Sequence, residues 1–130
     1  MEDLVYLTYK SIFNQSKYTP MDFSKIVGTS RQHNKDKSIT GILIFDGVNI
    51  FQYIEGSSNE IASLYQRICL DERHYEIKLL TKGVINSRKF VEWDMGYYYS
   101  SNGEPSLDEL LDENMQIDDL LQFVQQIDLV

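Results

Sequence analysis

The 130-residue sequence contains a single cysteine, Cys69, and no long hydrophobic run. One cysteine cannot form an internal disulfide, and no cysteine spacing typical of a metal site is present, so we expect a reducing cytoplasm and no metal. No apolar segment approaches the ~20 residues of a membrane-spanning helix, and the N-terminus lacks the basic and apolar regions of a signal peptide. The sequence therefore predicts a cytoplasmic protein without a membrane segment.

Positive charge is also scarce, with 12 Lys and Arg against 20 Asp and Glu and a net charge of -8. This balance argues against a nucleic acid or an anionic membrane surface as the partner. Aromatic residues are abundant, with nine Tyr and six Phe. A chain of this length with 42% hydrophobic residues predicts one globular domain with one real core.

The stretch Ser38–Gly56 is predicted to form a β-hairpin. Apolar residues fill 42–45, and Asp46-Gly47 is a strong signal for a tight turn, because such turns need the positive φ that glycine tolerates. In the second strand, Gln52 falls on the same face as Ile50, where an apolar residue is expected. A buried amide must be hydrogen-bonded, so Gln52 contacts either loop backbone or a polar ligand.

The other elements alternate around this hairpin. Thr19 and Pro20 are typical of a helix start, and Ser57 with Glu60 has the spacing of a capping box. The predicted elements are a strand at 4–8, a helix from 20 to about 31–34, the hairpin, a helix from 58 to about 70–73, a strand at 75–85 and a strand at 91–97. This order predicts an α+β fold, a ferredoxin-like βαββαββ sheet with both helices on one face.

The tail is expected to cover the other face of the sheet. Ser106 to Glu109 has capping-box spacing, and apolar residues recur at helical intervals over 117–127. We therefore divide the chain into a domain at 1–99 and a C-terminal helical extension at 100–130, with these helices on or near the open face. The apolar stripe is equally compatible with a partner surface.

Several polar residues fall on the helix-covered side of the predicted sheet. Arg67 and Asp71 are spaced i, i+4, which on its own predicts a surface salt bridge worth less than ~1 kcal/mol. Taken together, the polar groups around one cleft suit a flat ligand with donors and acceptors along its edge. These polar residues are Tyr9, Asn34, Gln52, Arg67, Asp71 and His74.

The motifs resemble those of one family, the BLUF blue-light sensors that use FAD. The resemblance covers about residues 4–97 and rests on the order and spacing of short strings. These strings are Ser38-Ile39-Thr40-Gly41, Phe51-Gln52-Tyr53-Ile54-Glu55-Gly56, Arg67-Ile68 with Asp71-Glu72-Arg73-His74, Arg88-Lys89-Phe90, and Trp93-Asp94-Met95.

The resemblance implies roles for individual residues. Tyr9 hydrogen-bonds Gln52, and Gln52 faces flavin N5 and O4. Asn34 pairs with the N3/O4 edge, Arg67 reaches the O2 side, and Asp71 lies near the ribityl chain. Tyr9 and Gln52 are then the photoactive pair.

Further positions follow from the same resemblance. Ile26 is expected to pack on the flavin ring, and His74 belongs to the flavin-binding set. His33 occupies a position where many members carry asparagine, which predicts altered contacts on the O2 side and an altered flavin affinity. Trp93 and Met95 match last-strand residues implicated in signal relay.

The implied function is a blue-light photoreceptor rather than an enzyme, with non-covalently bound FAD. With no output domain expected after Tyr99, the chain is interpreted as a short stand-alone member that signals through its tail or its assembly. We expect a downstream signalling protein as partner, and homo-oligomers. Two alternatives stay open, an acylphosphatase-like enzyme and a ligand-binding or dimerisation module without light chemistry on the same fold.

Overall fold

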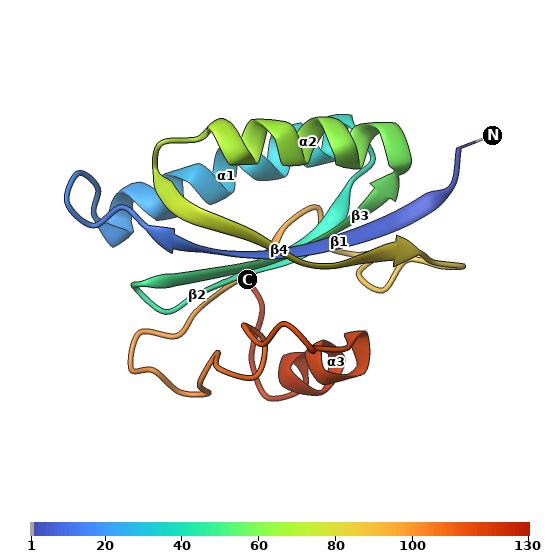
Figure 1. The fold of residues 1–130 in the computed structure, drawn as a ribbon. Helices are drawn as coiled ribbons and strands as arrows, with labels where there is room; N and C mark the ends of the chain where they lie inside the picture. Colours follow the sequence, from blue (N-terminus) through green and yellow to red (C-terminus); the bar gives the residue numbers. More distant parts are fainter. Residues whose placement is uncertain (1) are drawn as a thin grey trace.

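The computed structural model describes residues 2–130 as a sheet with helices on one face and a C-terminal extension on the other (Figure 1). None of the helices described between these residues has the length and apolarity needed to span a bilayer. The elements in chain order are β1 (Leu4–Phe13), α1 (Pro20–Asp36), β2 (Thr40–Phe45), β3 (Asn49–Ser57), α2 (Ser58–Leu70), β4 (His74–Val84), β5 (Gly96–Tyr99) and α3 (Ile117–Val124).

The five strands form one sheet in the order β4-β1-β3-β2-β5. All neighbouring pairs are antiparallel except β2 and β5, which are parallel. β1 and β3 are neighbours in the interior of the sheet, and α1 and α2 lie together on one side of it (Figure 1). This arrangement confirms the predicted α+β, ferredoxin-like fold.

Each face of the sheet has its own apolar core. On the face covered by α1 and α2, which we call the helix face, the core includes Leu7, Phe23 and Ile54. On the face covered by residues 100–130, which we call the extension face, Phe51 and Leu120 are fully buried. The strict alternation along β3 sends successive side chains to opposite cores, because neighbouring residues of a strand point to opposite faces.

The helix start at Thr19 is confirmed, with a capping box in which the Asp22 amide bonds the Thr19 hydroxyl and the Thr19 amide bonds the Asp22 carboxylate. The hairpin turn is one residue further along than predicted. Asp46 and Asn49 close it with a backbone hydrogen bond of 3.2 Å, so its central residues are Gly47 and Val48. Gly47 has φ +98, a value that explains the glycine.

The predicted bounds of β1 and β5 are wrong. β1 continues through Phe13 instead of ending near Tyr9, because it pairs with β3 on one side and β4 on the other over almost its whole length. β5 begins only at Gly96, since residues 91–95 form turns and bends beside β2. Gly41 in β2 has no side chain because the backbone of β3 lies too close: an added Cβ would lie 2.1 Å from the Tyr53 carbonyl oxygen.

Two predicted capping boxes are also wrong. Ser57 precedes α2, but its side chain makes no capping hydrogen bond. Ser106 accepts from the amide of Asp108 within a series of turns, and no helix begins there. The helix of the extension is α3, whose capping box is formed by Gln116 and Asp119. Its apolar stripe packs on the sheet, as expected for a cover of the open face.

Candidate functional site

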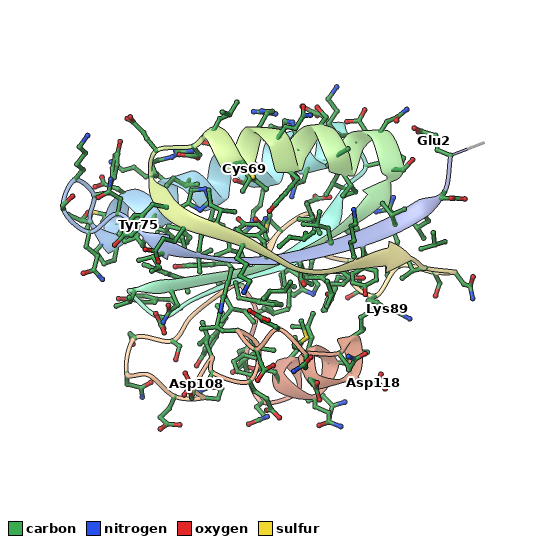
Figure 2. All side chains as sticks on the ribbon, viewed as in Figure 1. Glu2, Cys69, Tyr75, Lys89, Asp108 and Asp118 are labelled. Carbon is green, nitrogen blue, oxygen red and sulfur yellow. The ribbon has the colours of Figure 1, made fainter. Side chains whose placement is uncertain are left out.

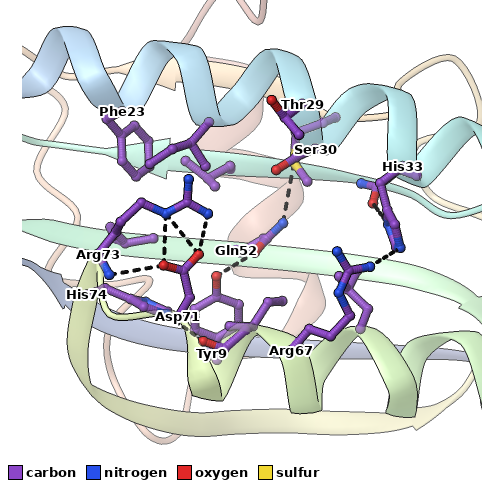
Figure 3. Close-up of a pocket in the computed structure, with 17 residues that line it drawn as sticks. Tyr9, Phe23, Thr29, Ser30, His33, Gln52, Arg67, Asp71, Arg73 and His74 are labelled. Carbon is purple, nitrogen blue, oxygen red and sulfur yellow. Dashed lines mark hydrogen bonds and ion pairs between the residues drawn. The ribbon is translucent and has the colours of Figure 1, made fainter.

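A cavity of about 180 Å³ lies between α1 and α2, above the interior strands β1 and β3 (Figure 3). Its walls combine apolar side chains of both helices with a small number of polar groups, the usual make-up of a small-molecule site. All residues that the sequence analysis assigned to the site line this cavity except Trp93. They are Tyr9, Ile26, His33, Asn34, Gln52, Arg67, Asp71, His74 and Met95.

Tyr9 and Gln52 are direct partners across β1 and β3. The Tyr9 hydroxyl donates to Oε1 of Gln52 at 2.5 Å, and both side chains are buried. Burial raises the pKa of Tyr9 far above its ordinary value, and the negative charge of Asp71 raises it further. The phenol is therefore fully protonated at neutral pH, and it holds its proton directly on the amide oxygen of Gln52.

The amide nitrogen of Gln52 has a much weaker partner. It donates to the sulfur of Met95 at 3.4 Å, and a thioether is a poor acceptor. Gln52 is only 4% exposed, so this NH2 group has two buried donor hydrogens and one soft contact. Because buried donors are normally hydrogen-bonded, this NH2 group is suited to donate to an acceptor on a ligand in the cavity.

Asn34 closes the cavity from α1. Its side-chain nitrogen donates to the Asp94 carbonyl oxygen at 2.7 Å, which ties α1 to the segment before β5. Its side-chain oxygen has only a long contact of 3.5 Å to His33 Nδ1. Asn34 is 1% exposed, so the fold positions this carboxamide rigidly while leaving its oxygen with spare accepting capacity.

The predicted Arg67–Asp71 salt bridge is wrong. Arg67 donates to Nε2 of His33, a contact that joins α2 to α1 at one end of the cavity (Figure 3). Asp71 instead pairs with Arg73, with Nε to Oδ1 at 2.8 Å. Burial disfavours the Asp71 carboxylate, but the Arg73 hydrogen bonds outweigh it and lower the pKa of Asp71 below its ordinary value.

His74 begins β4, one residue before the predicted start of this strand, and it connects three elements. Its Nδ1 lies 2.7 Å from the Ser11 hydroxyl and its Nε2 lies 2.7 Å from the Ile68 carbonyl oxygen. The ring meets the Tyr9 ring edge-on, with centroids 6.1 Å apart. His74 thus supports the Tyr9 ring from the α2–β4 junction.

Trp93 and Met95 do not share a face, contrary to the strand predicted over 91–97. Met95 is buried in the helix-face core, whereas Trp93 packs against the extension-face core. The segment between them turns, so the alternation of an extended strand does not apply there. Its anchor is the Gly41 amide, which donates to the Trp93 carbonyl oxygen at 3.0 Å.

Sequence reasoning missed two residues near Tyr9 and Gln52. Arg73 lines the cavity as the partner of Asp71. Tyr65 on α2 lies beside Tyr9, with ring centroids 6.0 Å apart. Tyr65 was assigned only to an apolar helical stripe, and its position beside Tyr9 follows from the packing of α2 on β1. Arg73 could have been found from its place in the Asp71-Glu72-Arg73-His74 string.

The residues present fit a flavin. A flavin ring is flat and apolar on its faces, and its edge carries nitrogen and oxygen acceptors and an N–H donor. The cavity offers apolar helix side chains such as Ile26 and Leu64 on its walls. It also offers the underused amide nitrogen of Gln52 and the underused amide oxygen of Asn34.

Known proteins resemble this chain in both sequence and structure. The curated relatives include the blue light- and temperature-regulated antirepressor BluF of Escherichia coli (strain K12), 35% identical over 66 residues, which are 51% of this chain and 16% of that protein. They also include photoactivated adenylate cyclase subunit beta of Euglena longa, 25% identical over 92 residues, which are 71% of this chain and 10% of that protein. The chain therefore spans a small part of these relatives.

Solved structures match over nearly the whole chain. The dark-state structure of BlrB, a BLUF protein, has a TM-score of 0.81 and 32% identity, over 96% of this chain and 95% of that one. The ground state of BlsA has a TM-score of 0.85 and 26% identity, over 98% of this chain and 91% of that one.

The family comparison distinguishes between the three functions that the sequence analysis left open. The family model for sensors of blue light using FAD matches residues 4–96, most of the chain. The photoreceptor interpretation is confirmed, and neither the acylphosphatase-like enzyme nor the module without light chemistry is supported. This chain belongs to the BLUF family of flavin-binding blue-light sensors.

Proposed function

We propose that this chain binds FAD between α1 and α2 and signals through the hydrogen bonds of Tyr9 and Gln52. The observation that carries the proposal is the buried Tyr9–Gln52 bond of 2.5 Å, next to an amide nitrogen whose contact is a sulfur at 3.4 Å. One end of Gln52 is tightly held and the other is weakly held. Such an amide can exchange hydrogen-bond partners when the bond between Tyr9 and its oxygen changes.

When bound, oxidised flavin excited by blue light is a strong one-electron oxidant. Tyr9 would give this electron to the flavin, and its hydroxyl proton would move along the existing bond to Oε1 of Gln52. The amide then rotates or returns as its tautomer, and the proton and electron go back to Tyr9, so no substrate is consumed. Gln52 ends with a new set of partners, and it no longer donates to Met95. The protein's part is to hold these groups in line.

Further residues are proposed to hold the cofactor. Asn34 bonds the N3/O4 edge, Ile26 packs on the ring, and His74 supports the site beside Asp71. Arg67 reaches the O2 side once it leaves His33. The cavity volume of about 180 Å³ is below the roughly 300 Å³ of ordinary ligand sites, so we expect the cavity to widen when flavin enters. The Arg67–His33 contact joins α1 and α2, and we propose that it opens in this step.

FAD is favoured over FMN because the family description names FAD. One similar structure, BlrP1 of Klebsiella pneumoniae, is described with FMN, at 27% identity and a TM-score of 0.70. The two cofactors share the ring and differ beyond the ribityl phosphate. Chromatography of the flavin released from the purified, denatured protein distinguishes them, and release of FMN alone would contradict the proposal.

The output is proposed to pass to a separate protein. Residues 1–99 would form the flavin-binding domain and residues 100–130 the extension that Met95 and Trp93 influence from the two faces of the sheet. The relatives named above are an antirepressor and a cyclase, which supports a downstream partner in general terms. A homo-oligomer is part of the same proposal, and light scattering in darkness and in blue light tests it.

The decisive experiment is the absorption spectrum of Tyr9→Phe beside the parent protein. We expect both to bind flavin, because the cavity keeps its shape. Only the parent should show a reversible red shift in blue light, since phenylalanine has neither the electron donor nor the transferable proton. Tyr65→Phe is the matched control and should keep the shift. A full shift in Tyr9→Phe would exclude Tyr9 as the donor.

A further inference from the structure

The residues after α3 return to the sheet and lie on the outer edge of β5. The Tyr97 amide donates to the main-chain oxygen of Val130 at 3.1 Å, and the Val130 amide donates to the Tyr97 carbonyl oxygen at 2.9 Å. Two residues that exchange both bonds form a hydrogen-bonded antiparallel pair. β5 is the last strand of the sheet, so the segment 129–130 covers an edge that would otherwise be open.

Arg31 on α1 connects residues 129–130, which we call the cover, to the cavity between α1 and α2. Its Nε donates to the Met95 carbonyl oxygen at 2.9 Å, and one of its terminal nitrogens donates to the main-chain oxygen of Val130. Met95 in turn accepts the hydrogen bond of Gln52 through its sulfur. A continuous series of contacts therefore runs from Gln52 through Met95 and Arg31 to Val130.

The cover is held weakly compared with the rest of the extension. Leu120 and Phe123 of α3 are buried in the extension-face core, so α3 is firmly attached to the sheet. Val130 is 66% exposed, and its main-chain bonds to Tyr97 and Arg31 face competition from water. Leu129 packs against the extension-face core but is only partly buried, whereas Leu120 and Phe123 are buried. Segments with few fully buried side chains open locally at low cost, so the edge can be uncovered without unfolding α3.

We propose that the outer edge of β5 is a docking strand for an extended segment of a partner protein, covered in the dark by residues 129–130 and controlled by Arg31. The occupant is an extended strand because the chain's own strand already sits there in antiparallel register, and exposed edges accept further strands. This inference rests on the proposed light response. Loss of the Gln52 contact frees Met95, which shifts the carbonyl group that Arg31 holds.

The charge around this edge indicates the partner's chemistry. No Lys or Arg follows Lys89 in the sequence, whereas ten acidic residues do. Asp94 just before β5 and Asp128 next to the cover are exposed, whereas Asp108 and Asp118 point away from the sheet and add only to the overall negative charge of the extension (Figure 2). The docking segment is therefore expected to carry basic residues beside its strand.

Hydrogen exchange of the flavin-loaded full chain tests the cover directly. We expect the Tyr97 amide to be protected in the dark and to exchange at least about tenfold faster in blue light. In the Arg31→Ala variant, the Tyr97 amide should exchange at this faster rate already in the dark. A hydrogen bond from a charged group is strong enough that its loss changes the equilibrium for opening of the cover about tenfold. Lys35→Ala, an exposed cation one turn further along α1, is the matched control and should behave like the parent.

A second measurement tests docking without relying on Arg31. The probe is a fluorescent peptide with the sequence of residues 125–130 preceded by two lysines. This peptide should bind the parent protein in blue light. It should also bind, even in the dark, a variant that lacks residues 129–130. A peptide with proline in the place of Val130 lacks the donor N–H and should bind neither.

The outcomes separate this inference from the proposed function. A normal spectral shift with unchanged Tyr97 exchange would overturn the cover and leave the photoreceptor intact. Unchanged dark exchange in Arg31→Ala would overturn the role of Arg31 as the controlling contact. An absent spectral shift in the parent would overturn the proposed function and the light control together. Failure of the peptide to bind the shortened variant would overturn the docking strand.

Discussion

Gln52 and Glu55 lie three residues apart on β3 and are both buried, at 4% and 0% exposure, but on opposite faces of the sheet. The Glu55 carboxylate accepts four hydrogen bonds. The donors are the Thr40 hydroxyl at 2.7 Å, the Tyr53 hydroxyl at 2.9 Å, the Lys89 amide at 2.8 Å and the Phe90 amide at 2.9 Å. Gln52 has one strong partner and one sulfur.

The difference indicates two uses for a buried polar side chain. Glu55 is saturated, and its bonds to two main-chain amides fasten the segment after β4 to the centre of the sheet. Gln52 keeps spare hydrogen-bonding capacity, which suits a group that changes partners. A saturated network contributes rigidity, whereas an unsaturated one favours a ligand or a switch.

Glu55→Ala is expected to have the largest effect on stability. It leaves four donors without their acceptor in a site closed to water, and we expect a loss of about 4 kcal/mol in the free energy of unfolding. Urea titration of the flavin-free protein measures it. The matched control is Glu60→Ala on α2, which should lose less than about 0.5 kcal/mol. Equal losses in the two variants would contradict the anchoring role of Glu55.

Leu120→Ala tests the apolar part of the extension face. Leu120 is fully buried under the sheet, and we expect a loss of about 3 kcal/mol, from lost burial and from the cavity left behind. Leu70 is 85% exposed, so Leu70→Ala is the control and should be nearly neutral. A neutral Leu120→Ala would mean that the extension does not contribute to the stability of the sheet.

Gln52→Leu is expected to cost only about 1 kcal/mol, because one buried hydrogen bond is lost and the Tyr9 hydroxyl is left without its acceptor. The light-induced red shift should disappear completely. The double variant Tyr9→Phe with Gln52→Leu removes both partners and should regain most of the stability. Thermal denaturation and absorption spectra report the two properties separately, and a retained red shift would contradict the role of Gln52.

The smallest expected effect concerns pH. The folded protein lowers the pKa of Asp71 below 3.8, so ionised Asp71 stabilises the fold at neutral pH. This contribution is complete above the unfolded pKa and is lost as pH falls through the lower folded value. Asp71 is partly exposed, so we expect less than about 1 kcal/mol. Asp71→Asn should flatten the stability profile below about pH 4, and an unchanged acid profile would contradict the Asp71–Arg73 pairing.

The sequence predicts the structure of β3 more completely than it predicts the contacts around β3. The period of two along 50–55 correctly separates the side chain of Gln52 from that of Glu55, because the alternation is a property of any extended backbone. The element order correctly predicts that β1 and β3 are neighbours. The helix stripes at 61–68 and 117–127 also pack as expected.

Partners beyond the local pattern could not be predicted in this way. Arg67 is correctly placed one turn before Asp71, but its partner is His33 on another helix. Trp93 and Met95 lie two residues apart and reach opposite cores, because the intervening chain turns beside β2. Spacing along a chain specifies a partner only while the secondary structure is regular and the partner is local.

The sequence alone determined the main helices and strands, their order and the side of the sheet that Gln52 faces, because these follow from local backbone geometry and hydrophobic periodicity. Tertiary structure decided how far β1 extends, which cation pairs with Asp71, and that Arg31 contacts both Met95 and Val130, which lie 64 and 99 positions further along the chain. Such contacts depend on how complete elements pack, and that packing is settled only when both cores close together.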